Sequence, residues 1–144
     1  MSLINILIAE DDPEDRTLLI EAFDEIGISS MVKMCNNGQE IFHYLDGLSD
    51  PDLFPGLIIL DAAMPVMDGL ETITALKENH RYHFIPVVIL SASENAGLRY
   101  KFIDKGARSY VIKPHSYDAN LAQYLYELLR FASSEIEINV LVSG

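Results

Sequence analysis

The amino-acid sequence predicts a doubly wound α/β domain with a five-stranded parallel sheet. Short aliphatic segments alternate five times with longer segments whose apolar residues recur every three to four positions. The chain has 144 residues, of which 49% are hydrophobic, so we expect one domain with a single core rather than a disordered chain. Strands that are apolar throughout are typical of a parallel sheet covered by helices on both faces, with right-handed crossovers.

The predicted strands are short apolar segments that end at charged or turn-forming residues. The segment “LINILIA” stops at an acidic triplet, and the segment “LIIL” stops at Asp61. The segment “MVKMC” is a weaker candidate. The five predicted strands are residues 3–9, 31–35, 57–60, 86–92 and 109–112.

A segment with helical periodicity follows each predicted strand. The first begins at Pro13 and is closed by Gly27, which are favourable residues just inside the start and just past the end of a helix. The five predicted helices are residues 13–26, 38–48, 70–79, 94–105 and 116–132. The sequence contains no second periodic region, so one domain occupies nearly the whole chain.

The charge of the chain argues against a nucleic-acid partner. It has 22 acidic and 10 basic residues and a formal net charge of −12, and such a chain repels a phosphate backbone. We find neither an apolar run long enough for a membrane span nor a signal-peptide pattern, and therefore expect a cytoplasmic protein without a membrane partner. The single cysteine, Cys35, and the four histidines show no ligand-like clustering, which argues against a zinc site.

Polar residues stand at the carboxyl ends of four predicted strands, where ligands bind in doubly wound folds. They are Glu10, Asp11 and Asp12 after the first strand, Asp61 after the third, Ser91 at the fourth and Lys113 after the fifth. With the strand order 2-1-3-4-5, these ends would surround one crevice. Carboxylates gathered there would repel one another, and Mg²⁺ with its oxygen ligands is the simplest ion to hold them ionised.

These residue types are suited to phosphoryl transfer. An aspartate carboxylate is already ionised at neutral pH and can attack phosphorus without a general base, while a metal ion and a lysine neutralise the phosphoryl oxygens. The predicted roles are Asp61 as nucleophile, Asp11 and Glu10 as the metal-holding pair, the Ala63 carbonyl as a further metal ligand, Ser91 as hydroxyl donor and Lys113 as fixed cation.

Four segments resemble the motifs of receiver domains of two-component response regulators. They are “ILIAED” with the acidic pair, “LIILDAAMPVMDG” with the phospho-acceptor, “VVILSA” with the hydroxyl residue and “GARSYVIKP” with the lysine. The resemblance implies a CheY-like, flavodoxin-like (βα)5 fold over residues 1–132 and phosphorylation of Asp61 with Mg²⁺ by a histidine kinase or histidine phosphotransfer protein. It also implies that Tyr110 is a rotating switch residue coupled to Ser91, and that the Lys113–Pro114 bond is cis.

The acidic triplet leaves two alternatives for the metal pair, Glu10 with Asp11 or Asp11 with Asp12. We prefer the first, because family members often carry an arginine five residues after the second acid, as Arg16 follows Asp11. Asp12 directly precedes Pro13 and is a good helix N-cap, so it is the second choice as a ligand. Glu10 would bind the metal ion directly or through a water molecule.

The sequence departs from the commonest family pattern at two positions of the expected site. The hydroxyl residue is Ser91 rather than threonine, and Ala63 stands two residues after the acceptor in place of a polar side chain. Ala63 can still offer its carbonyl, but its side chain cannot hydrogen-bond an attacking water. Both departures concern groups that affect how long a phosphoryl group would stay on Asp61.

The loop 48–56 and the tail 133–144 are longer than a minimal receiver needs, and both resemble small stand-alone regulators that partner phytochrome-type histidine kinases. The tail alternates apolar and mainly polar residues, so it is either an edge-pairing strand or a frayed terminus. A homodimer would form through this tail or through the face made by the fourth helix, fifth strand and fifth helix.

Three classes of function compete. The leading one is a phospho-accepting signalling switch, not an enzyme in the ordinary sense, with weak Mg²⁺-dependent self-phosphorylation and self-dephosphorylation. A phosphorylation-independent interaction module on the same fold is the alternative, and the intact Asp61, Asp11 and Lys113 count against it. The third class is a magnesium phosphohydrolase or a flavodoxin-like cofactor protein. The absence of an Asp-x-Asp motif after the first strand argues against the phosphohydrolase, and the acidic first loop, which is unsuited to bind a phosphate, argues against the cofactor protein.

Overall fold

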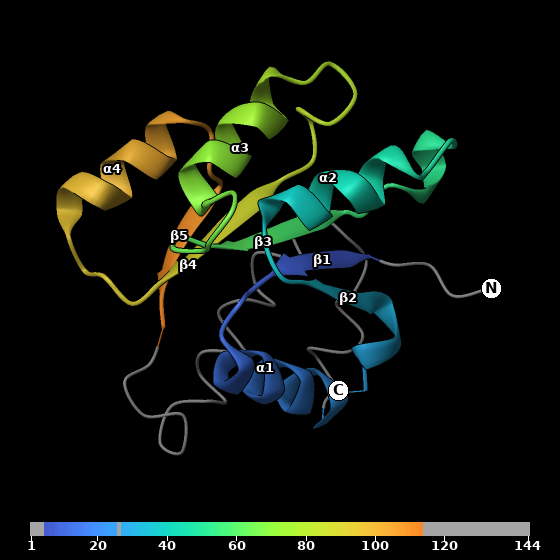
Figure 1. Ribbon diagram of the computed structural model, residues 1–144, viewed down its shortest axis with the longest axis horizontal. Coiled ribbons are helices and arrows are strands. Elements are labelled where there is room, and N and C mark those ends of the chain that lie inside the picture. The colour runs from blue at the N-terminus through green and yellow to red at the C-terminus, as the bar shows by residue number, and fades with distance from the viewer. Residues whose placement is uncertain (1–4, 26, 114–144) are drawn as a thin grey trace.

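The computed structural model describes residues 5–25 and 27–113 of the chain. Five parallel strands form one sheet in the order β2-β1-β3-β4-β5, with helices on both faces (Figure 1). The predicted fold class and strand order are therefore confirmed. The strands are β1 (Ile6–Ala9), β2 (Val32–Cys35), β3 (Leu57–Asp61), β4 (Val87–Ser91) and β5 (Ser109–Ile112).

The strands differ in burial as their sequences predict. β1, β3 and β4 are buried along their whole length, which explains their uninterrupted aliphatic sequences. β2 lies at the edge of the sheet and exposes part of its length, so its pattern predicts a strand more weakly. In the register of the sheet, Ala9 aligns with Cys35 and Leu60, and Ser91 aligns with Ile112. The carboxyl ends of the strands therefore meet at one edge.

Four helices connect the strands, and two short 3-10 turns precede β2 and β3. The helices are α1 (Pro13–Glu25), α2 (Gly38–Asp46), α3 (Gly69–Glu78) and α4 (Ala96–Asp104), and the turns are η1 (Ser29–Met31) and η2 (Pro51–Leu53). Each helix agrees with its predicted range to within two residues at either end. No helix within residues 5–25 and 27–113 is long and apolar enough to cross a membrane.

The hydrophobic core forms one layer on each face of the sheet. α2, α3 and α4 pack on one face through side chains that include Ile41, Ile73 and Phe102 (Figure 1). α1 packs on the other face through Leu19 and Phe23. Burial of these apolar side chains is the main force that holds the strand ends together.

Several predictions fall beyond the part of the chain that the structure describes. They are the first two residues of strand 3–9, the helix at 116–132, the tail at 133–144 and the geometry of the Lys113–Pro114 bond.

Candidate functional site

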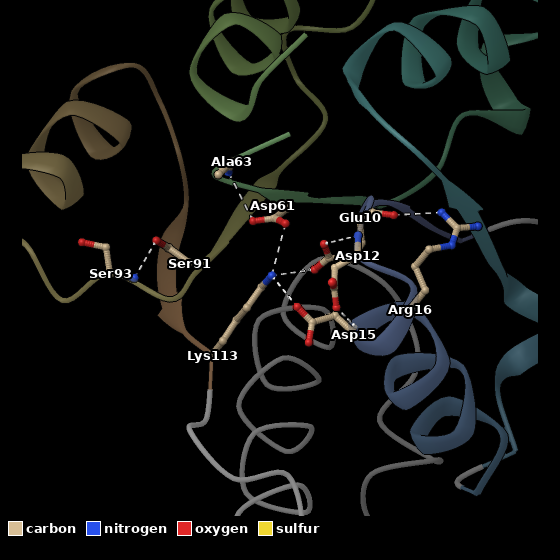
Figure 2. Close-up of polar contacts among 9 residues, drawn as sticks. All are labelled: Glu10, Asp12, Asp15, Arg16, Asp61, Ala63, Ser91, Ser93 and Lys113. Atoms are coloured by element: carbon tan, nitrogen blue, oxygen red, sulfur yellow. Dashed lines mark hydrogen bonds and ion pairs between the residues drawn. The ribbon is translucent and has the colours of Figure 1, made fainter. Parts of the chain in front are cut away.

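The polar residues predicted to meet at the strand ends do lie together. Glu10 follows β1, Asp61 ends β3 and Lys113 follows β5, and their side chains point toward one another at the carboxyl edge of the sheet (Figure 2). Ser91 ends β4 at the same edge, with its hydroxyl directed toward the Ser93 N–H. Glu10, Asp61 and Ser91 expose 0%, 6% and 4% of their surface. Buried polar groups are costly unless they are paired, so their concentration here marks this edge as the candidate site.

Three carboxylates at this edge are suited to hold a divalent cation. One carboxylate oxygen from each of Glu10, Asp11 and Asp61 lies within 4.8 Å of the others. Oε1 of Glu10 is buried and accepts no hydrogen bond of good geometry from the described residues, although it lies near the ammonium of Lys113. Such an oxygen is a fitting acceptor for a metal ion or a metal-bound water. The acidic cluster therefore fits the expected Mg²⁺.

The carboxyl group of Glu10 is fully buried and has a raised pKa. Burial raises the pKa of its carboxyl group, the neighbouring Asp61 raises it further, and Lys113 offsets only part of this, so that the pKa is about 8. A neutral Glu10 beside Asp61 avoids two adjacent negative charges in a buried site. A divalent cation in the cluster would supply the charge that the proton otherwise supplies.

The side chain of Asp12 caps the N-terminus of α1. Its Oδ2 accepts a hydrogen bond of 2.8 Å from the backbone N–H of Asp15, as a helix N-cap does, and its own side chain is exposed. Arg16 donates to the backbone carbonyls of Glu10 and Cys35, both at 2.8 Å, and so ties the ends of β1 and β2 together. This geometry favours Glu10 with Asp11 as the metal pair, which stays a prediction.

Lys113 is the central cation of the site. Its Nζ lies 2.7 Å from Glu10 Oε1, 2.9 Å from Asp15 Oδ2 and 3.2 Å from Asp61 Oδ2 (Figure 2). Burial alone would lower the pKa of the ammonium, but the close contacts with the carboxylates of Glu10 and Asp15 and the charge of Asp61 outweigh burial and raise the pKa. The lysine is therefore positively charged throughout the physiological pH range.

The loop after Asp61 is shaped by close backbone packing. The Ala63 N–H donates to Asp61 Oδ1 at 3.2 Å, which orients the carboxylate. Asp68 and Glu71 form a full capping box at the start of α3. A Cβ on Gly69 would lie 2.6 Å from the Asp61 carbonyl oxygen, so only glycine fits there. The Asp68–Gly69 pair therefore forms the turn that starts α3.

Ser91 and Tyr110 are linked through the loop that follows β4. The Ser93 N–H donates to Ser91 Oγ at 3.0 Å, and the Tyr110 hydroxyl donates to the Ser93 carbonyl at 2.8 Å. The Tyr110 ring is 3% exposed and lies 6.0 Å from the ring of Phe102, centroid to centroid. The structure therefore connects Ser91 and Tyr110 through Ser93, and their coupling stays a prediction.

Asp15 is the site residue that sequence reasoning missed. It lies in the first turn of α1, where acidic residues are common for their interaction with the helix dipole, so its identity gives no sign of a partner in the segment after β5. Only the folded structure brings it to Lys113, which is 98 positions away in the sequence.

Comparison with known proteins bears on this arrangement. A model of the response regulator receiver domain family matches residues 6–125. The chain belongs to this family. The predicted resemblance is confirmed, and members of the family are signalling switches rather than enzymes in the ordinary sense.

Two curated relatives illustrate the range of proteins that contain this domain. The probable methanogenesis regulatory protein FilR2 of Methanothrix harundinacea (strain 6Ac) is 29% identical over 118 residues, which cover 78% of this chain and 74% of FilR2. The transcriptional regulatory protein PcoR of Escherichia coli is 34% identical over 131 residues, which cover 90% of this chain and 53% of PcoR. The chain thus spans about half the length of PcoR.

Two solved structures resemble the chain over most of its length. The phosphorylated cyanobacterial phytochrome response regulator RcpA has a TM-score of 0.75 and 27% identity, covering 94% of this chain and 95% of RcpA. RPA3017, a response regulator in red light signalling of R. palustris, has a TM-score of 0.73 and 27% identity, covering 88% of this chain and 89% of RPA3017. The predicted likeness to regulators of phytochrome signalling is therefore confirmed.

Proposed function

We propose that Asp61 accepts a phosphoryl group, and that this change in charge switches the affinity of the protein for a partner. The observation that carries the proposal is that Asp61 contacts the Lys113 ammonium and also belongs to the carboxylate cluster of Glu10 and Asp11. The ammonium is a fixed cation, and the cluster offers a place for Mg²⁺. This is the charge arrangement that stabilises a phosphoryl group in transfer.

The reaction we propose is a direct displacement at phosphorus. A carboxylate oxygen of Asp61 forms the new O–P bond while the bond between phosphorus and the leaving atom of the donor breaks, and the leaving group keeps that electron pair. Lys113 neutralises a phosphoryl oxygen, and the Ser91 hydroxyl donates to another. Glu10 and Asp11, with Asp61 and the Ala63 carbonyl, would hold Mg²⁺, which supplies further positive charge to the phosphoryl oxygens when bound.

The donor we propose is the phosphohistidine of a histidine kinase or of a histidine phosphotransfer protein. RcpA is a phytochrome response regulator, and RPA3017 is a response regulator in red light signalling. The likeness to these two proteins makes a phytochrome-type kinase the first candidate to test. The extent of the receiver domain over residues 1–132, and a homodimer through α4, β5 and the fifth helix or through the tail, also stay predictions.

The test is phosphorylation by acetyl phosphate with Mg²⁺, followed by intact-mass analysis. We expect the wild type to gain one phosphoryl mass, the gain to disappear when the metal is chelated, and the Asp61→Asn variant to gain none. A wild type that stays unmodified under conditions where a known receiver is phosphorylated would favour the phosphorylation-independent module. An equal gain in Asp61→Asn would show that another residue is the acceptor.

A further inference from the structure

The carboxylate of Asp15 is an ion-pair partner of Lys113 that the proposed function does not use. Asp15 Oδ2 lies 2.9 Å from Lys113 Nζ, whereas Asp61 Oδ2 lies 3.2 Å from it. The side chains of Asp15 and Lys113 are 19% and 11% exposed, so the pair is mostly shielded from water. Shielded pairs are screened by salt less than pairs on the open surface. Salt therefore weakens this contact less than it weakens an ordinary surface ion pair.

Helices α1 and α3 each follow an aspartate, Asp12 or Asp68, and each has an acidic residue three positions after it. The two acidic side chains make different contacts. In α3, Asp68 and Glu71 cap the helix reciprocally, so that the Glu71 carboxylate accepts from the Asp68 N–H. In α1, the Asp12 N–H donates instead to Glu10 Oε2 at 3.3 Å. The corresponding carboxylate in α1, that of Asp15, is turned toward the end of β5 (Figure 2). Its position is thus not explained by capping.

Among the described residues, Lys113 has three ionic partners, and phosphoryl transfer affects each of them differently. An ammonium group has three N–H donors, and three carboxylates from three elements surround this one. The carboxylate of Asp61 loses its negative charge when it becomes a phosphoaspartate, and the negative charge then lies on the phosphoryl oxygens. Glu10 belongs to the acidic cluster that fits Mg²⁺. Asp15 lies in α1, outside both changes, and can stay bound to the ammonium throughout.

We propose that Asp15 is a positioning residue that holds the Lys113 ammonium in place while one of its donors passes from Asp61 to a phosphoryl oxygen. A lysine side chain has four rotatable bonds, and ordering it during the reaction would cost conformational entropy. Asp15 supplies this order in advance, through a contact that does not include the reacting atoms. The inference rests on the proposed function of Asp61.

Two variants and a matched control test this role. Asp15→Ala removes the contact, whereas Asp15→Asn has the same shape and keeps a neutral acceptor. Glu14→Ala is the control, because Glu14 is the neighbouring acidic residue in the first turn of α1 and is exposed. It removes the same charge from the same helix end, so a general effect on net charge or on the helix dipole would appear in it equally.

The first measurement is the ¹⁵N NMR signal of the Lys113 ammonium in the protein without metal or donor, assigned by its loss in Lys113→Met. We expect this signal in the wild type and in Glu14→Ala, and its loss or broadening in Asp15→Ala, because an ammonium with fewer fixed partners exchanges its protons faster. The second measurement is the rate of phosphorylation by acetyl phosphate with Mg²⁺. We expect Asp15→Ala to be about fivefold slower than Glu14→Ala, with Asp15→Asn between them, since a neutral acceptor bonds less strongly.

The inference is overturned if Asp15→Ala and Glu14→Ala give the same ammonium signal, or the same rate in a protein that is phosphorylated. It is also overturned if Asp15→Ala is faster than the control, since Asp15 would then hold Lys113 back. If Asp15→Ala does not fold, the same comparisons are made with Asp15→Asn. A wild type that takes no phosphoryl group refutes the proposed function, while the ammonium signal alone still decides whether Asp15 fixes Lys113.

Discussion

The hydroxyl group of Tyr110 donates a hydrogen bond of 2.8 Å to the backbone carbonyl of Ser93, two residues after the end of β4. The Ser93 N–H in turn donates to Ser91 Oγ, so an unbroken series of contacts joins the expected phosphoryl-binding hydroxyl to the Tyr110 ring. The family resemblance implies a ring that moves inward when Ser91 moves. In this structure the ring is buried against Phe102. The Ser93 contact is therefore the part that we expect to change.

We predict that phosphorylation reorganises the loop after β4 through Ser91. A phosphoryl group that accepts a hydrogen bond from Ser91 Oγ draws this hydroxyl away from its contact with Ser93. NMR spectra with Mg²⁺ and beryllofluoride, a phosphoryl mimic, should show shifts at Ser93 and Tyr110 in the wild type. Ser91→Ala should show shifts confined to the surroundings of Asp61, and equal shifts at Tyr110 in both proteins would contradict the prediction.

A second prediction separates the two candidate metal pairs. Asp11→Asn should weaken Mg²⁺ binding about tenfold or more, because it removes a charged ligand from the carboxylate cluster. Asp12→Asn should leave the affinity nearly unchanged, since asparagine also caps helices well. Isothermal titration calorimetry measures both. A larger loss for Asp12→Asn would move the metal pair one residue along the chain.

A third prediction concerns the close approach of α2 and α3. A Cβ on Gly38 would lie 1.7 Å from the hydroxyl oxygen of Thr72, which is buried and donates to the Asp68 carbonyl. Gly38→Ala should therefore lower the free energy of unfolding by about 1–3 kcal/mol, as overpacking does. Gly47→Ala is the control, because its Cβ would meet no atom closer than 3.4 Å. Urea unfolding curves of the two variants should differ clearly; curves with equal midpoints would refute the clash.

A fourth prediction gives the pH dependence of stability at alkaline pH. Burial raises the pKa of Tyr82, and its hydrogen bond to Asp46 raises it further, from 10 to about 12. The folded state therefore keeps the phenol proton where the unfolded chain has lost it. The stability that this provides is fully present below pH 10 and is lost as the pH rises toward about 12.

Urea unfolding of the wild type and of Tyr82→Phe at a series of pH values tests this. The variant has no phenol at this position, so its stability should fall less steeply above pH 10 than that of the wild type. Tyr100→Phe, which alters a ring that is 70% exposed, should follow the wild type. Parallel curves for the wild type and Tyr82→Phe would contradict the shift.

The sequence was sufficient for the fold because each of its signals is local. The aliphatic runs of β3 and β4 predict buried strands, and Pro13 and Gly27 predict the limits of α1. The carboxyl edge could be predicted because parallel strands must end together. The ion pair of Asp15 with Lys113 and the Tyr110–Ser93 hydrogen bond could not be predicted, because both depend on the orientation of a side chain in the folded structure. No periodicity or spacing records such an orientation.

The three ionic contacts of Lys113 also have a consequence for how the chain acquires its structure during synthesis. Lys113 is 98 positions after Asp15 and 52 positions after Asp61 in the sequence. A nascent chain that has not reached β5 carries the acidic residues of β1, α1 and β3 without the cation that balances them. Their mutual repulsion opposes premature closure of this edge. A competent site therefore cannot assemble until the chain beyond β5, with Lys113, has been synthesised.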